Sequence, residues 1–468
     1  MPSTDLISTA ERIMKMCSGE GADQVEVYIE SRENLVMRIQ KVSGKDSFTA
    51  RDQLMVGAAI RVIRSGALGF AYLSSIDDQS VKSSARSALK VAEPQAGLES
   101  FHEKPSNYPK VSGTLDKDTA EMGPDKVMSH LEAIRKGVAR VDDKRVTVYD
   151  ALFGRSKYGF AVVNTQGLEV EDYGSFARMA IGISAKNGEK VAKLELPHVT
   201  RSVKNTAVTE NFGSESARRV LKGLGTQNIE PKKMPVVMAP AAIGEIFTYS
   251  FTNAFCADNV QHKASVLEGK IGQQVAAPIV TLVDDGTFDG GLCSFKMDDE
   301  GMPTKKTTLI EKGILKNYLH DNQTAKIAST ESTGNCARWE LPTVDYFFYR
   351  TYRRLPRVYP TNVVFQPGTA PNDKIIAEVK DGLFLDRSDP AFTATPDGSF
   401  SVVILSGLRI ENGELTTPVR DLRITGNMFD YVKKIDAVGN TAEKYSPQLY
   451  AGSVIAPYVR VQDVSIQT

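Results

Sequence analysis

The sequence is poor in the residues that build the commonest metal and disulfide sites. Its 468 residues include only four cysteines and five histidines. The cysteines lie far apart, so the CxxC motifs of zinc ribbons and thioredoxin-like proteins are absent. The histidines do not occur as pairs three to five residues apart, so there is no HExxH motif. We therefore expect reduced, mostly buried thiols and no metal site built from one local motif.

Net charge and long apolar runs are missing as well. Lysine plus arginine and aspartate plus glutamate each number 57, so the formal net charge is zero, which argues against a nucleic-acid partner. No apolar run approaches the ~18 residues of a membrane helix. The first residues lack the basic and apolar regions of a secretory signal. The sequence predicts a cytoplasmic protein without a membrane-spanning segment.

Motifs of nucleotide-binding proteins and serine hydrolases are also absent. There is no GxxxxGK[ST] loop and no GxSxG elbow, and the glycines near residues 223–225 and 269–272 do not form a dinucleotide fingerprint. What is present is a globular composition, with 41% hydrophobic and 24% charged residues. A chain of this length and composition buries a large core and forms one to three domains.

Hydrophobic periodicity predicts an α+β first half. Helical spacing indicates helices at residues 6–17, 79–92, about 124–138 and 214–224. Alternating patterns indicate strands at residues 25–29, 36–42, 146–153, 160–165 and 176–185, and a hairpin over 55–72 that turns at Ser65-Gly66. Residues 94–123 are irregular and are expected to form a loop.

The second half has a different sequence pattern. A strand at residues 236–238 and a helix at 241–255 precede many short apolar segments separated by Gly, Asn and Asp. Turn signals at this spacing predict a β-rich domain that is sandwich- or barrel-like. The fold class is therefore α+β, with an N-terminal α+β domain at residues 1–225 and a C-terminal β-rich domain at 226–468. Residues 225–235 are the predicted linker.

The densest acidic cluster is Asp298-Asp299-Glu300, followed by Gly301. Hard cations bind such carboxylates, but adjacent residues on a strand point to opposite faces and a following glycine indicates a turn. A solvated or turn-forming cluster is favoured over a cation site. A rebuilt metal site that combines His262, His320 and this cluster stays open as an alternative.

Residues 346–359 interleave arginines with aromatic side chains. Such mixtures stack bases and bind phosphates, and they are also enriched at protein interfaces. Because the net charge is zero, a subunit or peptide contact is favoured over nucleic acid, and an ordinary exposed loop stays open. The candidate contact residues are Tyr349, Arg350, Arg353 and Arg354.

Several segments together resemble the TldD/PmbA family, also called modulators of DNA gyrase. In the first half these are GADQVEVYIESRENLVMRIQKV at residues 21–42 and RSGALGFAYLSS at 64–75. In the second half they are SVLEGKIGQQV at 265–275, FKMDDEGMPTKKTTLIEKGILKNYLHD at 295–321, STGNCAR at 332–338, GSFSVVILSGLRIENGELTTPVRDLRITGN at 398–427 and AGSVIAPYVRV at 451–461. The set spans nearly the whole chain in one order.

The resemblance implies a cytosolic zinc metallopeptidase built from two related chains. TldD-type chains carry HExxxH on the helix before the SxxxGxxG segment, and a cysteine near the C-terminus; the histidines bind zinc and the glutamate is the general base. In this sequence Thr248 and Asn253 stand at the histidine positions, Tyr249 at the glutamate position and Ala451 at the cysteine position. None is a usual zinc ligand, and tyrosine, with a reference pKa of about 10, is a poor base.

The chain is therefore identified as similar to the PmbA (TldE)-type subunit, which lacks the zinc motif. The resemblance implies a heterodimer in which the TldD-like partner holds zinc, and unfolded peptides as substrates. This chain would be inactive alone, would complete the chamber around the partner's zinc and would gate peptide entry. The alternative is a stand-alone homodimeric binding protein that kept the fold without peptidase chemistry.

Two roles are open for the segment that replaces HExxxH, residues 248–253. Tyr249, Phe251 and Asn253 would line a pocket equivalent to the partner's active site. Alternatively the helix is ordinary core, because Ile243 and Phe247 recur at helical spacing with Phe251.

Overall fold

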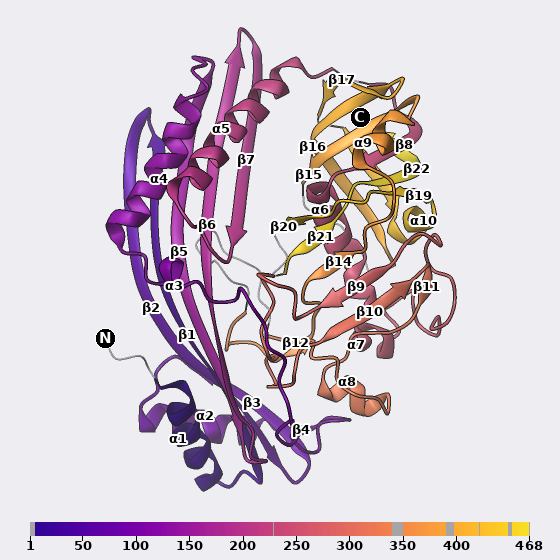
Figure 1. The fold of residues 1–468 in the computed structure, drawn as a ribbon. Helices are drawn as coiled ribbons and strands as arrows, with labels where there is room; N and C mark the ends of the chain where they lie inside the picture. Colours follow the sequence, from indigo (N-terminus) through magenta and orange to yellow (C-terminus); the bar gives the residue numbers. More distant parts are fainter. Residues whose placement is uncertain are drawn as a thin grey trace.

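The computed structural model describes residues 5–227, 229–338, 350–389, 397–420, 422–447 and 452–467, and of Tyr249 and Ser250 only the backbone. The N-terminal half is built on one antiparallel sheet of seven strands in the order β4-β3-β2-β1-β5-β6-β7 (Figure 1). Its strands are β1 (Gln24–Val42), β2 (Lys45–Arg64), β3 (Ala67–Leu73), β4 (Glu93–Pro94), β5 (Val146–Asn164), β6 (Glu169–Asn187) and β7 (Lys190–Thr200). Its helices are α1 (Leu6–Gly19), α2 (Asp78–Lys90), α3 (Lys117–Ala120), α4 (Pro124–Ala139), α5 (Thr206–Lys222) and the 3-10 turn η1 (Gly223–Gly225).

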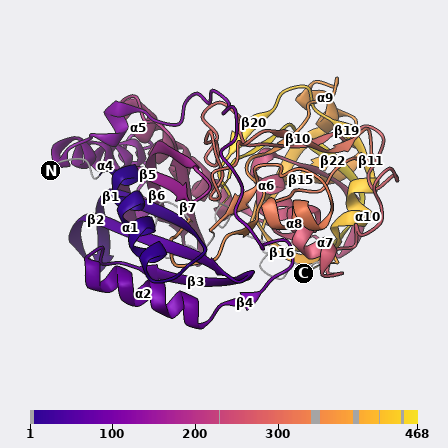
Figure 2. The ribbon, with the colours of Figure 1, turned by 90° about the horizontal axis from the view of Figure 1, so that it is seen from below.

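The two faces of this sheet have different partners. Odd-numbered positions of β1, such as Val25 and Val27, pack against apolar side chains of α1 and α2. Even-numbered positions are buried too, because the C-terminal half covers them: Tyr28 clusters with Phe295. Successive side chains of a strand point to opposite faces, so both faces of the strand lie in the interior. Figure 2 shows the two halves side by side.

The strands are longer than the periodicity predicts. The predicted pairs at residues 25–42 and 146–165 are each one continuous strand of 19 residues. The hairpin turn at Ser65-Gly66 is confirmed, with φ of 50° and 77°, the left-handed values that tight hairpins require. The helix predicted at residues 214–224 begins eight residues earlier, as α5. Its early part carries Thr209, Glu210 and Ser214, whose buried polar groups hide the apolar pattern.

The C-terminal half contains two larger sheets and a two-stranded pair, β12-β13. One has the order β11-β10-β9-β14-β21-β20; the other has the order β15-β8-β22-β18-β16-β17, and pairing of β15 with β16 closes five of its strands into a barrel. The strands are β8 (Lys232–Met238), β9 (Leu282–Asp285), β10 (Lys306–Glu311), β11 (Ile314–Leu315), β12 (Cys336–Ala337), β13 (Arg357–Val358), β14 (Val363–Phe365), β15 (Asp381–Ser388), β16 (Ser399–Glu411), β17 (Glu414–Val419), β18 (Arg423–Asn427), β19 (Ile435–Val438), β20 (Glu443–Tyr445), β21 (Val454–Ala456) and β22 (Val459–Gln467). The helices are α6 (Pro240–Ser250), η2 (Thr252–Phe255), α7 (Ala257–Gln261), α8 (Asn322–Ile327), α9 (Asn372–Ala377) and α10 (Met428–Lys433).

The predicted fold class, an N-terminal α+β part followed by a β-rich part, is confirmed. The predicted linker at residues 225–235 is partly wrong, because β8 begins within it and pairs with both β15 and β22. The boundary at residues 225/226 stays a prediction. The helix predicted at 241–255 is split at Phe251 into α6 and the tighter turn η2.

Candidate functional site

The segment that replaces HExxxH lies on α6 and η2, within the apolar core of the C-terminal half. Thr248 is only 3% exposed, and its hydroxyl donates to the Gly244 carbonyl one turn earlier in the same helix. Phe251 is 1% exposed and its ring lies 5.1 Å from that of Phe255 and 5.0 Å from that of Phe429. The expectation that Phe251 lines a pocket is therefore wrong: it is a core residue.

The zinc that the resemblance implies does not fit these residues. The Thr248 hydroxyl already donates to its own helix, and the exposed Asn253 holds the Asn259 side-chain amide through its backbone carbonyl at 2.8 Å. The Tyr249 side chain and Ala451 lie outside the described residues. Within the described ranges no three His, Cys, Asp or Glu side chains come together as a metal-ion site. Among the described residues, His262, His320 and the carboxyl groups of residues 298–300 therefore do not come together as the alternative metal site.

The acidic cluster at residues 298–300 is turn-forming, as one of the two favoured alternatives predicts, but it is buried, so the solvated alternative is wrong. It does form a turn: Gly301 has a φ of 78°, and the Asp298 carboxylate accepts from the backbone amides of Glu300 at 3.0 Å and Met302 at 2.9 Å. Its other oxygen accepts from the Cys336 amide at 3.1 Å. A charged turn is buried here because the inner face of the N-terminal sheet covers it with arginine.

Buried arginines join the two halves through this turn. Arg61 on β2 donates to both oxygens of Glu26 at 2.8 Å and to Glu300 at 2.9 Å. Arg350 lies 3.3 Å from Asp299, and the Arg338 guanidinium lies over the Tyr28 ring. We call this set, Glu26, Arg61, Asp299, Glu300, Arg338 and Arg350, the seam network. Arg61 and Glu300, 239 positions apart in sequence, are thus held together by a charge-assisted bond.

The protonation of the acidic turn follows from these contacts. Burial raises the pKa of Asp298, and the neighbouring Glu300 charge raises it further. Burial also raises the pKa of Asp299, although Arg350 and Arg338 oppose the shift. Burial disfavours the charged form of Glu300 as well, but the Arg61 charge and the hydrogen bonds from Asn322 and Arg61 oppose it, and the Glu300 pKa is lowered. Of the three carboxyl groups of the turn, Glu300 is the one whose pKa is lowered, so its charged form is the most favoured.

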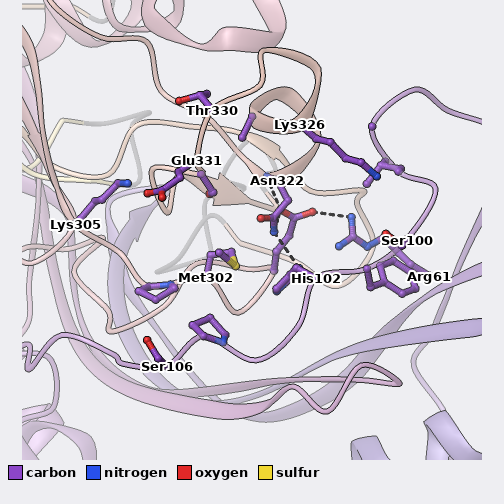
Figure 3. Close-up of a pocket in the computed structure, with 18 of the residues that line it drawn as sticks. Arg61, Ser100, His102, Ser106, Met302, Lys305, Asn322, Lys326, Thr330 and Glu331 are labelled. Atoms are coloured by element: carbon purple, nitrogen blue, oxygen red, sulfur yellow. Dashed lines mark hydrogen bonds and ion pairs between the residues drawn. The ribbon is translucent and has the colours of Figure 1, made fainter.

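A cavity of about 690 Å³ opens beside the seam network, between the loop at residues 97–107 and α8. Arg61 and Glu300 form part of its lining, and Lys305 and Glu331 lie on the opposite side (Figure 3). The Asn322 side chain lies beside His102 (Figure 3) and also contacts Glu300. The cavity is thus lined by charged groups from both halves of the molecule.

The tautomer of His102 follows from its partner. Asn322 donates its side-chain amide to Glu300 at 2.9 Å, and the same nitrogen lies 3.1 Å from Nδ1 of His102. Because an amide nitrogen only donates, Nδ1 accepts and the ring proton is on Nε2. Glu99, in the loop at residues 97–107, pairs with Lys326 of α8 at 2.7 Å and so holds this loop against the helix. The sequence gives no spacing signal for this arrangement, since its residues come from distant segments.

The arginine-aromatic segment is divided between interior and surface. Arg350 is buried in the seam network, so its assignment to an exposed contact is wrong. Arg353 and Arg354 are exposed, next to Leu355, which is 45% exposed. Tyr349 lies outside the described residues. Separately, none of the helices in the described ranges has the length and apolar character needed to cross a membrane.

Comparison with known proteins places the chain. Residues 231–468, half of the chain, match the family model of the PmbA/TldA metallopeptidase C-terminal domain. The chain belongs to the PmbA/TldD family. An uncharacterized protein of Methanocaldococcus jannaschii is 27% identical over 96% of this chain and 97% of its own length. The metalloprotease TldD homolog of Haemophilus influenzae is 24% identical, covering 94% of this chain and 90% of that protein.

The fold agrees with a solved structure from the same family. The crystal structure of TldE from Thermococcus kodakarensis superimposes with a TM-score of 0.84 and 25% identity, covering 98% of this chain and 100% of that chain. As a PmbA/TldD family member, this chain therefore shares both its sequence pattern and its two-part architecture with relatives that include named metalloproteases.

Proposed function

We propose that this chain is the metal-free subunit of a TldD/TldE-like zinc metallopeptidase complex that degrades or processes unfolded peptides. The observation that carries the proposal is how the side chains on α6 and directly after it are bonded and packed. Where the family's zinc-binding motif is expected, Thr248 donates to its own helix and Phe251 packs into the core. Zinc and the general base are then supplied by a TldD-like partner, and this chain completes the chamber around them.

The exposed arginines after the seam network support a contact with that partner. Arg353 and Arg354 are exposed directly after Arg350, which the seam network fixes in place. Arginine anchored on a rigid base beside an exposed apolar residue such as Leu355 is typical of protein interfaces. We infer that this turn contacts the partner or the peptide that it gates.

Zinc content and peptidase activity test the proposal directly. The purified chain is measured alone, the TldD-like chain alone, and the two together, with an unfolded polypeptide as substrate. We expect no stoichiometric zinc in this chain alone, and full turnover only in the mixture. Stoichiometric zinc with turnover by the pure chain would overturn the proposal. A stable homodimer that does not bind the TldD-like chain would favour a stand-alone binding protein.

The contact surface is tested separately by charge reversal. The double variant Arg353→Glu/Arg354→Glu should no longer co-elute with the TldD-like chain in size-exclusion chromatography. The matched control is Arg145→Glu, an exposed arginine whose partner Asp143 lies two residues away in the N-terminal half. Co-elution of both variants with the partner would show that the turn at residues 353–354 is not the contact.

A further inference from the structure

A second cavity lies where the two halves meet at the other end of the molecule. It has a volume of about 280 Å³ and is lined by α5, η1 and β7 from the N-terminal half and by β15, β16 and β17 from the C-terminal half. In Figure 1 the chain leaves α5 at the top of the view and crosses to the C-terminal half beside β17. This cavity is separate from the seam network and shares no lining residue with the cavity beside it.

The inside of this cavity is mostly apolar. Val220 of α5, Phe384 of β15 and Val419 of β17 are all buried and line it. Leu408 and Tyr458 add further apolar surface. Small-molecule sites are mostly apolar, with a few polar groups that fix orientation, and begin at about 300 Å³. The space is therefore suited to a single apolar group of modest size.

The polar groups around this apolar space are mainly cationic. Lys193, Arg219, Lys222 and Arg420 line it, and among the described lining residues Asp386 is the one carboxylate. The Asp386 carboxylate lies 3.6 Å from the Arg219 guanidinium, so these two charges form an ion pair. The exposed Lys193 and Lys222 form no ion pair with any described carboxylate. An excess of positive charge thus borders an apolar interior.

We infer that this cavity binds a small molecule that carries one carboxylate on an apolar group. The apolar group would enter between Val220 and Phe384, and the carboxylate would be held by Lys193 and Lys222 in a charge-assisted contact. A medium-chain fatty acid and the free C-terminal end of a hydrophobic peptide share this chemistry. The inference is independent of the proposed peptidase role, because it uses none of the residues assigned to it.

A ligand bound in this cavity would also contact both halves of the molecule. Next to the cavity, the Gln227 amide donates to the Pro418 carbonyl at 2.9 Å, and Arg420 donates to the Val191 carbonyl at 2.8 Å. These bonds tie the connection after η1 and the edge strand β7 to β17. A ligand that contacts both sides adds to these ties, and ligands that bind the native state raise its thermal stability.

The test uses the full chain with four probes, kept below any micellar concentration: decanoate, decanol, N-acetyl-leucyl-phenylalanine and its C-terminal amide. We expect saturable calorimetric binding and a rise in Tm with at least one carboxylate, and at least tenfold weaker binding of its uncharged counterpart. Binding of decanoate alone assigns the site to fatty acids, and binding of the peptide alone assigns it to peptide ends. No binding, or equal binding of charged and uncharged probes, would overturn the inference.

Charge variants locate the binding on the molecule. Lys193→Gln/Lys222→Gln should weaken carboxylate binding at least tenfold without lowering the Tm of the free protein, because both side chains are exposed. The matched control, Lys186→Gln, changes an exposed lysine on β6 outside the lining and should bind as the parent does. Unchanged binding in the double variant would place the ligand elsewhere and contradict the inference.

Discussion

Two interior regions of this protein are built from opposite kinds of side chain. Around α6 the interior is mainly apolar, with Phe247, Phe251 and Phe255 in ring contact and Glu245 as a buried exception that accepts from Tyr445. Between the two halves the interior is ionic, with Arg61 bound to Glu26 and Glu300. On α6 and directly after it, Thr248 donates within its own helix and Phe251 packs into this apolar core. The buried charge of this chain is instead used to hold the inner face of the long sheet against the C-terminal half.

The ionic region should be the more sensitive of the two to a single change. Arg61→Met leaves Glu26 and Glu300 buried without their shared partner, so it should lower the free energy of unfolding by about 3–5 kcal/mol. Urea denaturation measures this. The control is Arg135→Met, which removes an exposed pair with Asp46 and should cost less than about 1 kcal/mol. Equal costs for the two variants would show that the seam network does not hold the halves together.

Buried carboxylates of the C-terminal half should make stability depend on pH. Burial raises the pKa of Asp284 to about 7, although Asn335 and Thr361 donate to it. Between about pH 4 and pH 7 the unfolded chain ionises this group while the folded chain keeps the proton, so folding takes up a proton and stability falls as pH rises.

Asp284→Asn should remove this contribution to the pH dependence of stability. Its size is on the order of 2–4 kcal/mol in the free energy of unfolding between about pH 4 and pH 7. Urea midpoints at several pH values from 4 to 8 measure it. Asp143→Asn is the control, because Arg145 lowers the pKa of Asp143 to about 2 and its contribution changes only in more acidic solution. A parent protein whose stability rises from pH 4 to 7, with an unchanged slope in Asp284→Asn, would contradict the assignment.

The smallest effect is expected at the family motif position itself. Thr248→Val removes a hydroxyl whose acceptor, the Gly244 carbonyl, belongs to the same helix, so the cost should stay below about 1 kcal/mol. It should also leave peptide turnover of the assembled pair unchanged. Thr324→Val is the comparison variant, since it breaks the capping box with Asp321 that starts α8 and should cost about 1–2 kcal/mol. A turnover loss in Thr248→Val alone would assign this position a direct role in the complex.

The sequence predicts local structure better than it predicts which faces are covered. The turns of the first half, such as the hairpin turn at Ser65-Gly66, are local, so the sequence predicts them. The alternation in β1 correctly indicates one buried face, but Glu26 and Glu30 on the other face suggest solvent. Glu26 pairs with Arg61 on the neighbouring strand, and Glu30 pairs with Arg32 two residues further along β1. These pairs are buried because the C-terminal half covers this face of the sheet, and no local pattern carries that information.

The same reason explains what was missed at the candidate site. The four cysteines are free and buried, as composition predicts. In contrast, residues 298–300 look like a surface turn until Arg61 and Arg350 are placed against them. His102 and Asn322 meet only because the loop at residues 97–107 is held on α8. Sites assembled from three distant segments need the fold before they can be recognised.

The long strands of the N-terminal sheet have a consequence for how the chain reaches this structure. β1 and β2 pair through all 19 residues of β1 across the tight turn at Ser43-Gly44, so this hairpin can form from local contacts alone. The partner of β1 on its other edge, β5, arrives far downstream, as does the charged turn that Arg61 requires. Loop closure over such separations is slow. Until it is complete, Glu26 and Arg61 of the hairpin pair only with each other, on a face that the C-terminal half covers later.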